Sequence, residues 1–210
     1  MYRMLRSNGS LVSSYPVPLG TGTPYRYTRG GCYDGTGYIL WINYSGRYVC
    51  RARASNGSVV SSFNWSSGSR YAVAVDHNGT SGGTYVYCNY YNGDFWKYTT
   101  SGSLISSFNM PYYTYNYDAA WDWNNDLLWC INYNNDWVYG IDPDTEAVVR
   151  SFRHPNQANI SSSYGIAYWP PYLYTSNSGG TPDEYVWVLS CPNNLTIAPA
   201  SIGKVKALFK

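Results

Sequence analysis

One phrase recurs along the chain at a nearly constant interval, and it constrains the fold more than any other feature. It runs from Asn8 to Tyr15 as Asn-Gly-Ser-Leu-Val-Ser-Ser-Tyr, and it returns at 56–63, at 101–108 and, in a drifted form, at 145–152. The closing aromatic residues are 48, 45 and 44 residues apart. An Asn-Gly turn followed by a β-branched run is typical of a hairpin that leads into a strand. Each copy therefore predicts the same local structure.

A second phrase lies between the copies and has the pattern strand, Asp-containing turn, strand. It is found at 33–41, 75–87 and 121–129, with a weaker version at 168–174. Each of the first three versions is followed by another turn and a third strand. These third strands are expected at 47–52, 95–98 and 137–141. One period therefore holds four short strands.

Four strands in such a period are the pattern of a β-propeller blade. A helical solenoid has a similar period, but it needs apolar residues at a spacing of 3.6, which no segment shows. We therefore predict an all-β protein in which residues 1–210 form a single β-propeller domain of about five four-stranded blades. The blade repeats are expected at about 24–65, 68–111, 114–154 and 164–200.

The two ends of the chain leave the closure of the ring open. Strands are expected within 2–17 and 201–210, for closure or for subunit exchange. In a five-bladed ring, the N-terminal strand pair completes a blade begun by the C-terminal tail. In the alternative four-bladed ring, that pair joins 164–176, and 184–210 becomes an exchanged segment that pairs with another subunit.

The Asp-containing hairpins at 74–87 and 119–129 resemble the repeats of extracellular propellers of the NHL and YVTN type. The segment at 141–149, Ile-Asp-Pro-Asp-Thr-Glu-Ala-Val-Val, adds to this resemblance, which covers most of residues 25–190. It implies a propeller fold. It leaves activity open, because propellers carry unrelated functions.

The composition excludes several classes of protein. Only 12% of the residues are charged, whereas 19% are aromatic, with 25 Tyr and 9 Trp. Disordered chains are poor in aromatic residues, and no apolar run approaches the roughly 18 residues that cross a bilayer. The net charge is +2, and the basic residues are scattered apart from Arg47, Arg51 and Arg53, so we predict no nucleic-acid partner.

The polarity of the chain comes from Tyr, Ser, Thr, Asn and Gly, which indicates an extracellular or cell-surface protein. The first ten residues lack the apolar region of a signal peptide, so the export route stays open. The five cysteines have no metal-binding spacing. Cys88 and Cys130 fall at equivalent positions of the second strand, and we interpret them as small core residues.

The sequence contains no credible catalytic site, and we predict neither an enzyme nor a cofactor. The two histidines, His77 and His154, lie in a turn and before a proline, without spaced partners for zinc or a triad. Asp34, Asp76 and Asp122 recur at one repeat position. Three such carboxylates could ligate calcium, but we expect each to accept backbone N–H groups of its own turn, and we predict no metal site.

Aromatic residues in the connections form the candidate ligand-binding face, because exposed Tyr and Trp suit stacking on sugars or contacts with proteins. These residues are Trp65, Tyr112, Tyr113, Tyr115, Tyr117, Tyr44 and Tyr90. Asn-x-Ser/Thr motifs are candidate acceptors for glycosylation. They begin at Asn8, Asn43, Asn56, Asn64, Asn78, Asn159 and Asn194.

Two functions remain open. Many Tyr, few charges and an ambiguous C-terminal strand favour a structural or adhesive scaffold that self-associates into an oligomer, filament or surface array. The alternative is a propeller that binds a glycan or peptide through its Tyr/Trp-rich face. An enzyme is the third reading.

Overall fold

The computed structural model describes residues 2–4, 11–14, 28–43, 47–65, 70–76, 84–90, 93–110, 115–132, 135, 137–154, 163–177, 185–190 and 204–206. Every regular element in these ranges is a β-strand. A search of the same residues finds no helix of the length and hydrophobicity that crossing a membrane requires.

The strands form four four-stranded antiparallel sheets and one two-stranded sheet. Blade 1 holds β3 (Thr28–Tyr33), β4 (Tyr38–Asn43), β5 (Tyr48–Arg53) and β6 (Val59–Asn64). Blade 2 holds β7 (Arg70–Asp76), β8 (Tyr85–Tyr90), β9 (Asp94–Thr99) and β10 (Leu104–Asn109). Blade 3 holds β11 (Asn116–Asp122), β12 (Leu127–Asn132), β13 (Trp137–Asp142) and β14 (Ala147–Arg153). Blade 4 holds β15 (Ser163–Trp169), β16 (Tyr172–Asn177), β17 (Tyr185–Ser190) and β18 (Lys204–Lys206).

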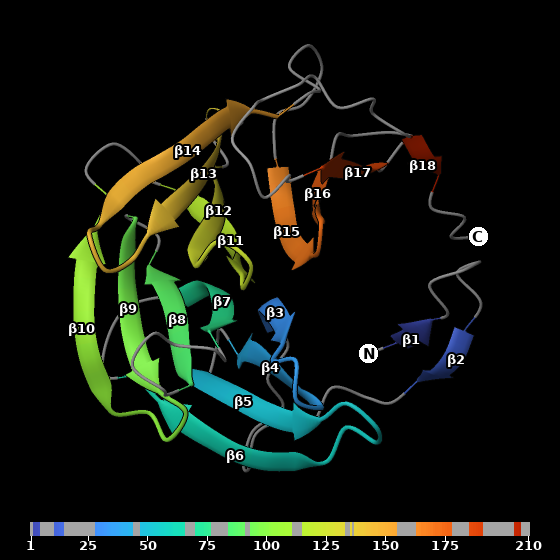
Figure 1. Ribbon diagram of the computed structural model, residues 1–210. Helices are drawn as coiled ribbons and strands as arrows, with labels where there is room; N and C mark the ends of the chain where they lie inside the picture. The colour runs from blue at the N-terminus through green and yellow to red at the C-terminus, as the bar shows by residue number, and fades with distance from the viewer. Residues whose placement is uncertain are drawn as a thin grey trace.

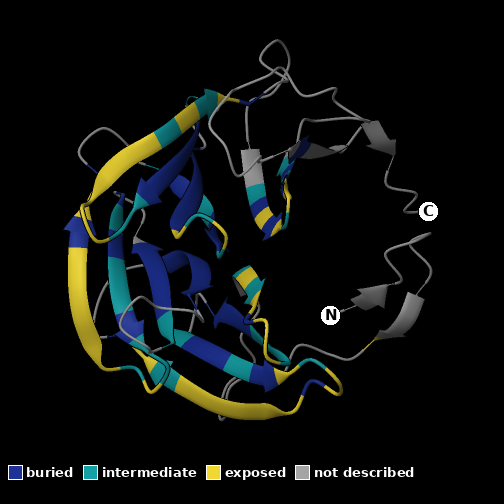
Figure 2. Ribbon diagram, in the orientation of Figure 1, coloured by how far each residue is buried: buried dark blue, intermediate teal, exposed yellow. Residues whose placement is uncertain are grey.

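The blades are arranged around a central axis, with β3, β7, β11 and β15 nearest to it and the fourth strands at the rim (Figure 1). Within each blade, consecutive strands are neighbours. The β-propeller fold predicted from the repeat is confirmed. Burial follows the same order, because β7 and β12 are buried throughout, whereas β6, β10 and β14 are mostly exposed (Figure 2).

Three of the four hydrophobic cores among the described residues are each shared by two blades, and the fourth, with Trp41, Cys50 and Ala52, lies within blade 1. The core between blades 2 and 3 joins Tyr87 and Phe95 to Trp121 and Leu128. The core between blades 1 and 2 joins Ile42 and Val49 to Val73, Val75 and Val86 of β7 and β8. The core between blades 3 and 4 joins Trp129 and Ile131 of β12 to Ile166 of β15 and Leu173 of β16. A strand that buries both faces needs apolar residues on both, which explains the nearly continuous apolar runs of the second strands.

The recurring aspartates act as predicted for two blades. Asp34 accepts hydrogen bonds from the backbone N–H of Thr36 and Tyr38, at 2.8 and 3.0 Å. Asp122 accepts them from the backbone N–H of Asn124 and Asn125, at 3.0 and 3.1 Å. These are Asx-type turns, which tie the first strand of a blade to the second.

The equivalent cysteines of blades 2 and 3 are core residues, which confirms their interpretation. Cys88 and Cys130 are fully buried, and both are free thiols. Burial raises the pKa of the Cys88 thiol to about 12 and that of Cys50 to about 11. These thiols therefore stay neutral and unreactive at physiological pH.

Among the residues that the structure describes, the strands near the two ends of the chain pair in neither of the two predicted ways. β17 pairs with β16, and β18 pairs with β17, so residues 185–190 and 204–206 complete blade 4 of their own chain. The prediction that 184–210 is exchanged with another subunit is wrong for these residues. β1 (Tyr2–Met4) and β2 (Leu11–Ser14) pair only with each other among the described strands, in a two-stranded sheet at the open side of the ring (Figure 1).

Two polar contacts join blade 3 to blade 4. His154, which directly follows β14, is fully buried, and its Nε2 lies 2.7 Å from Oγ1 of Thr175 in β16. Asp118 in β11 accepts the backbone N–H of Ile166 in β15, at 3.0 Å. Burial lowers the pKa of His154 to about 4, so the imidazole is neutral in the folded protein at neutral pH.

Close packing at Gly140 gives a first test of the core. A Cβ at this position would lie 2.9 Å from Cζ3 and 3.0 Å from Cη2 of Trp129. We expect Gly140→Ala to lower the free energy of unfolding by about 1–3 kcal/mol through overpacking. At Gly31 the nearest atoms lie at 3.5 Å and 3.9 Å, so Gly31→Ala is the matched control, with an effect within about 0.5 kcal/mol. Urea unfolding of both variants measures the difference; equal effects would contradict the packing.

Neutral His154 predicts a pH dependence of stability. Between pH 6.5 and about 4, the unfolded chain binds a proton at this residue that the folded protein does not. Stability is therefore lost as the pH falls through this window, by up to about 3 kcal/mol from this group. Urea unfolding of the wild type and of His154→Gln at pH 7, 5.5 and 4 measures this effect. The difference in free energy of unfolding between the two proteins should change by this amount between pH 7 and pH 4. A difference that does not change with pH would show that His154 titrates normally.

Candidate functional site

Of the residues predicted for a ligand-binding face, the three whose side chains the structure describes do not form an exposed surface together. Trp65 is only 2% exposed and belongs to the core between blades 1 and 2, so the prediction of an exposed Trp65 is wrong. Tyr115 and Tyr117 are half-buried, and Tyr117 packs edge-on against Tyr71 at a centroid distance of 5.1 Å. Tyr90 ends β8, but its side chain is not described. Tyr44, Tyr112 and Tyr113 lie outside the described residues.

The glycosylation motifs also separate by exposure. Asn43 is 1% exposed, which corrects its prediction as an acceptor, because a glycan cannot be carried by a buried side chain. Asn56 and Asn64 are exposed, and Asn56 Oδ1 also accepts the backbone N–H of Ser58, at 3.0 Å. Asn8, Asn78, Asn159 and Asn194 lie outside the described residues.

Exposed aromatic side chains gather instead where the innermost strands turn into the second strands. Tyr33 ends β3 and is 45% exposed, Trp169 ends β15 and is 46% exposed, and Tyr172 begins β16. Trp123 follows β11, and its ring meets that of Trp169 edge-on, at a centroid distance of 6.1 Å and an angle of 88°. We call Tyr33, Trp123, Trp169 and Tyr172 the aromatic mouth.

Three residues of the aromatic mouth, Tyr33, Trp123 and Trp169, line a cavity of about 260 Å³ at the centre of the propeller. Its wall comes from all four innermost strands, including Cys32, Val75, Ala119 and Ile166. Trp123 also meets Tyr168 edge-on, at a centroid distance of 5.3 Å. Aromatic walls with few polar groups are typical of sites that bind small ligands.

Blade 4 departs from the repeat at this place. Blades 1, 2 and 3 have Asp34, Asp76 and Asp122 where the innermost strand ends, whereas blade 4 has Trp169 followed by Pro170. The proline pair forms the turn between β15 and β16, so the chain reverses without an Asp. The position that elsewhere holds a buried carboxylate therefore presents an exposed indole ring.

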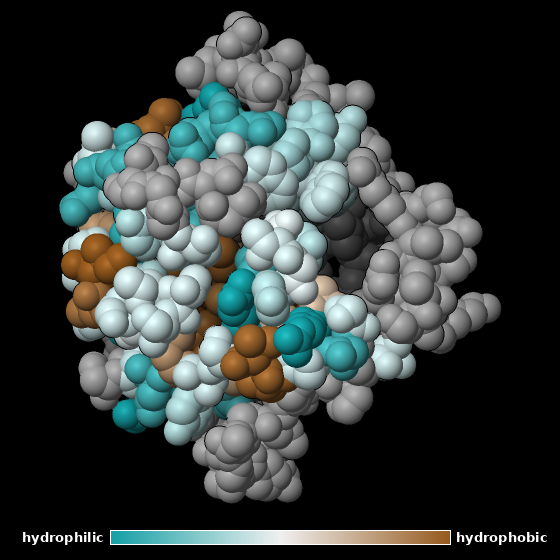
Figure 3. All heavy atoms as spheres, turned by 60° about the horizontal axis from the view of Figure 1, so that its bottom comes forward, coloured by the Kyte–Doolittle hydropathy of each residue, from teal (hydrophilic) through white to brown (hydrophobic). Residues whose placement is uncertain are grey.

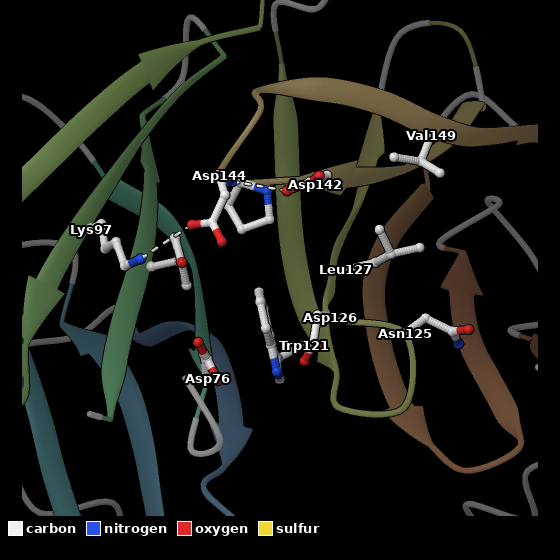
Figure 4. Close-up of a pocket in the computed structure, with 11 residues that line it drawn as sticks. Asp76, Lys97, Trp121, Asn125, Asp126, Leu127, Asp142, Asp144 and Val149 are labelled. Carbon is white, nitrogen blue, oxygen red and sulfur yellow. Dashed lines mark hydrogen bonds and ion pairs between the residues drawn. The ribbon is translucent and has the colours of Figure 1, made fainter. Parts of the chain in front are cut away.

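A second hollow lies between blades 2 and 3 on the same side of the ring, with a volume of about 340 Å³ (Figure 4). We call it the acidic cleft, because four of its lining residues are aspartates. They are Asp76, Asp126, Asp142 and Asp144. Lys97 lines it as well, with Nζ 3.8 Å from Oδ1 of Asp144 and 4.3 Å from the ring centre of Tyr85.

Trp121 separates the two hollows, because it lines both of them. One face of its ring stacks on Tyr87, with a centroid distance of 5.5 Å and an angle of 4°. Figure 4 shows the nitrogen-bearing end of Trp121 in the part of the cleft where Asp76 and Asp126 lie. The indole nitrogen is buried and has no hydrogen-bond partner.

In blades 1 and 3, the aspartate at the position of Asp76 is bound by a side chain of its own blade. Arg51 Nη2 lies 2.9 Å from Asp34 Oδ2, and its guanidinium sits 3.8 Å from the ring centre of Tyr38. Burial opposes the charge of Asp34, but the hydrogen bonds from Arg51 and from the turn hold its pKa below the usual value. In blade 3 the indole N–H of Trp129 donates to Asp122 Oδ2, at 3.1 Å.

The ionisable groups near the central cavity serve the fold. Asp118, which sequence reasoning missed, has a pKa raised to about 7 by burial. Its two carboxylate oxygens accept the backbone N–H of Ala119 and of Ile166, so it holds β11 against β15. Burial, together with the charge of Asp118, raises the pKa of the Cys32 thiol. A neutral thiol is a poor nucleophile.

In the described part of the chain, no histidine contacts Asp118 or Cys32. His154 is buried between blades 3 and 4, and His77 lies outside the described residues. A search of the described residues for three or more His, Cys, Asp or Glu in a metal-binding arrangement finds none.

Comparison with known proteins supports the fold. No protein-family model matches the chain, and no curated protein matches it. Among solved structures, a streptogramin B lyase is 14% identical with a TM-score of 0.59, covering 98% of this chain and 61% of the lyase. The virginiamycin B lyase of Staphylococcus aureus is 16% identical with a TM-score of 0.56, covering 100% of this chain and 63% of the lyase.

The glutaminyl cyclase of Myxococcus xanthus is 13% identical with a TM-score of 0.58, covering 72% of this chain and 68% of the cyclase. The chain thus spans about three-fifths of the length of the two lyases. Identities this low show a shared fold and leave function open. The protein is a β-propeller protein.

Proposed function

We propose that this protein is a non-catalytic, extracellular glycan-binding propeller, with the aromatic mouth as its binding site. The observation that carries the proposal is the grouping of exposed Tyr33 and Trp169 with Trp123 around one cavity. Trp and Tyr rings give rigid apolar area with a polar atom at the edge, which suits the C–H faces and the hydroxyl groups of a sugar ring.

Polar groups beside the mouth complete such a site. Thr36, Asn124 and Asp126 are exposed in the turns that connect the first and second strands, next to the aromatic residues. Their side chains can donate to or accept from sugar hydroxyls. Extracellular location, which the composition favours, is where free and cell-surface glycans are met.

We propose a non-catalytic protein because the ionisable groups near the cavity are neutral, hydrogen-bonded to the backbone or buried. The Cys32 thiol is held neutral, Asp118 uses both oxygens for backbone N–H groups, and His154 is enclosed by two blades. A nucleophile or general base must lie within reach of a substrate and be in the protonation state that the reaction needs.

A second candidate, a self-associating scaffold, is favoured by the rim. Each of three successive outer strands exposes a pair of apolar residues, each residue between 41% and 52% exposed. They are Val59 and Val60, Leu104 and Ile105, and Val148 and Val149. On the face shown in Figure 3, hydrophobic atoms form separate areas and no continuous patch. This favours the glycan-binding proposal as the main function, because large interfaces need contiguous apolar area.

Substitutions in the aromatic mouth test the proposal directly. A broad glycan array first identifies oligosaccharides that bind the wild-type protein, and isothermal titration calorimetry then measures their affinity for each variant. We expect Trp169→Ala and Tyr33→Ala each to weaken binding about tenfold, through loss of stacking worth roughly 1–1.5 kcal/mol. Leu104→Ala removes an equally exposed side chain from the rim and should bind as the wild type does. A wild-type protein that binds no glycan on the array would overturn the proposal.

The rim predicts a separate result for the second candidate. If the outer strands mediate association, Leu104→Ser with Ile105→Ser should shift sedimentation velocity profiles toward the monomer at every protein concentration. A wild-type protein that sediments as a monomer throughout would remove this candidate.

A further inference from the structure

We propose that the central cavity binds an aromatic ring attached to the glycan, so that the ligand held at the aromatic mouth is an aryl-substituted sugar. The inference rests on the proposed function and adds the chemical class of the ligand. The cavity and the mouth are continuous, because Tyr33, Trp123 and Trp169 belong to both.

The wall of the cavity is apolar. None of the described residues that line it carries a charge, a side-chain amide or an aliphatic hydroxyl group. Burial raises the pKa of the Cys32 thiol, so this group is neutral as well. The nearby carboxyl group of Asp118 accepts the backbone N–H groups of Ala119 and Ile166. The cavity therefore favours an uncharged, apolar group.

A sugar ring itself does not suit this wall. Each ring carries several hydroxyl groups, and a hydroxyl that is buried without a hydrogen-bond partner weakens binding. Polar side chains lie in the turns beside the mouth, where Thr36, Asn124 and Asp126 are exposed. The sugar ring therefore stays at the mouth, and the group that enters the cavity is an apolar substituent of the sugar.

The size of the cavity favours a ring over a methyl group. Its volume is about 260 Å³, whereas an apolar cavity of about 150 Å³ is enough to bind benzene. The methyl group of a deoxy sugar would leave most of the wall without contacts. An N-acetyl group would in addition bring an amide that needs hydrogen-bond partners.

The aromatic side chains of the wall favour an aromatic ring over an alkyl chain. Aromatic rings pair edge-to-face at centroid distances of about 4.5–7 Å. Trp123 makes two such contacts, with Tyr168 at 5.3 Å and with Trp169 at 6.1 Å. These rings form a series from exposed Trp169 to buried Tyr168, which a ligand ring can extend. An alkyl chain of similar area loses more rotational freedom on binding.

Isothermal titration calorimetry with four glycosides of one sugar tests the inference. The sugar is the terminal monosaccharide of the best ligand on the glycan array, and its methyl, phenyl, cyclohexyl and octyl glycosides differ only in the attached group. We expect the phenyl glycoside to bind about tenfold more tightly than the methyl glycoside, because the phenyl ring is removed from water. It should also bind more tightly than the cyclohexyl and octyl glycosides.

Ala167→Leu tests whether the ring binds in the cavity. Ala167 lines the cavity and is exposed, so a larger side chain fills the space without overpacking the core. In this variant, the ratio of the affinities for the phenyl and methyl glycosides should fall toward one. Ala147→Leu is the matched control, since it makes the same change at an exposed residue of β14 outside the cavity lining. It should keep the wild-type ratio.

Equal affinity for the phenyl and methyl glycosides, or an unchanged ratio in Ala167→Leu, overturns the inference while glycan binding stands. Tighter binding of the cyclohexyl or octyl glycoside than of the phenyl glycoside overturns it in favour of an aliphatic substituent. Binding of phenol alone as tightly as the phenyl glycoside overturns the link between ring and sugar. Failure to bind any glycan on the array overturns the proposed function itself.

Discussion

Each blade of this propeller buries the faces of its inner strands against its neighbours, and the position of the other features depends on these shared cores. Tyr87 stacks on Trp121 across the boundary between blades 2 and 3, and hydrophobic cores also join blade 1 to blade 2 and blade 3 to blade 4. Because the first strands of blades 1, 3 and 4 lie at the centre (Figure 1), the residues that end or follow them, Tyr33, Trp123 and Trp169, line one cavity. The proposed ligand site lies at that cavity, and the chemistry we propose for it depends on the side chains that these turns carry.

The blades could be predicted from the repeat, because residues with the same structural role recur at the same repeat position. Asp34 and Asp122 accept their turn N–H groups, and Cys88 and Cys130 fill equivalent core positions. The closure of the ring was not predictable in the same way. Lys204–Lys206 alternates basic and apolar residues, which suits an outer strand, a closing strand or a donated one equally well, and only its pairing with β17 decides among them.

The site was harder to predict than the fold, since it lies where the blades differ from one another. Trp65 lies in a connection, and connections are usually exposed, yet the core of blades 1 and 2 covers it. Trp169 lies in the weaker version of the second phrase, and its ring is exposed. Trp121 belongs to the core between blades 2 and 3, and it also lines both hollows. Deviations from the repeat, such as Trp169 in place of an Asp, were the available signal.

The central claim is that the side of the ring where first strands turn into second strands binds the ligand. Hydrogen–deuterium exchange of the protein, with and without a saturating oligosaccharide, tests it most directly. The account predicts slower exchange in the ligand-bound state at 33–38, 121–127 and 169–172. Slower exchange confined to the opposite ends of the strands, around 43–48, 89–94 and 132–137, would contradict it.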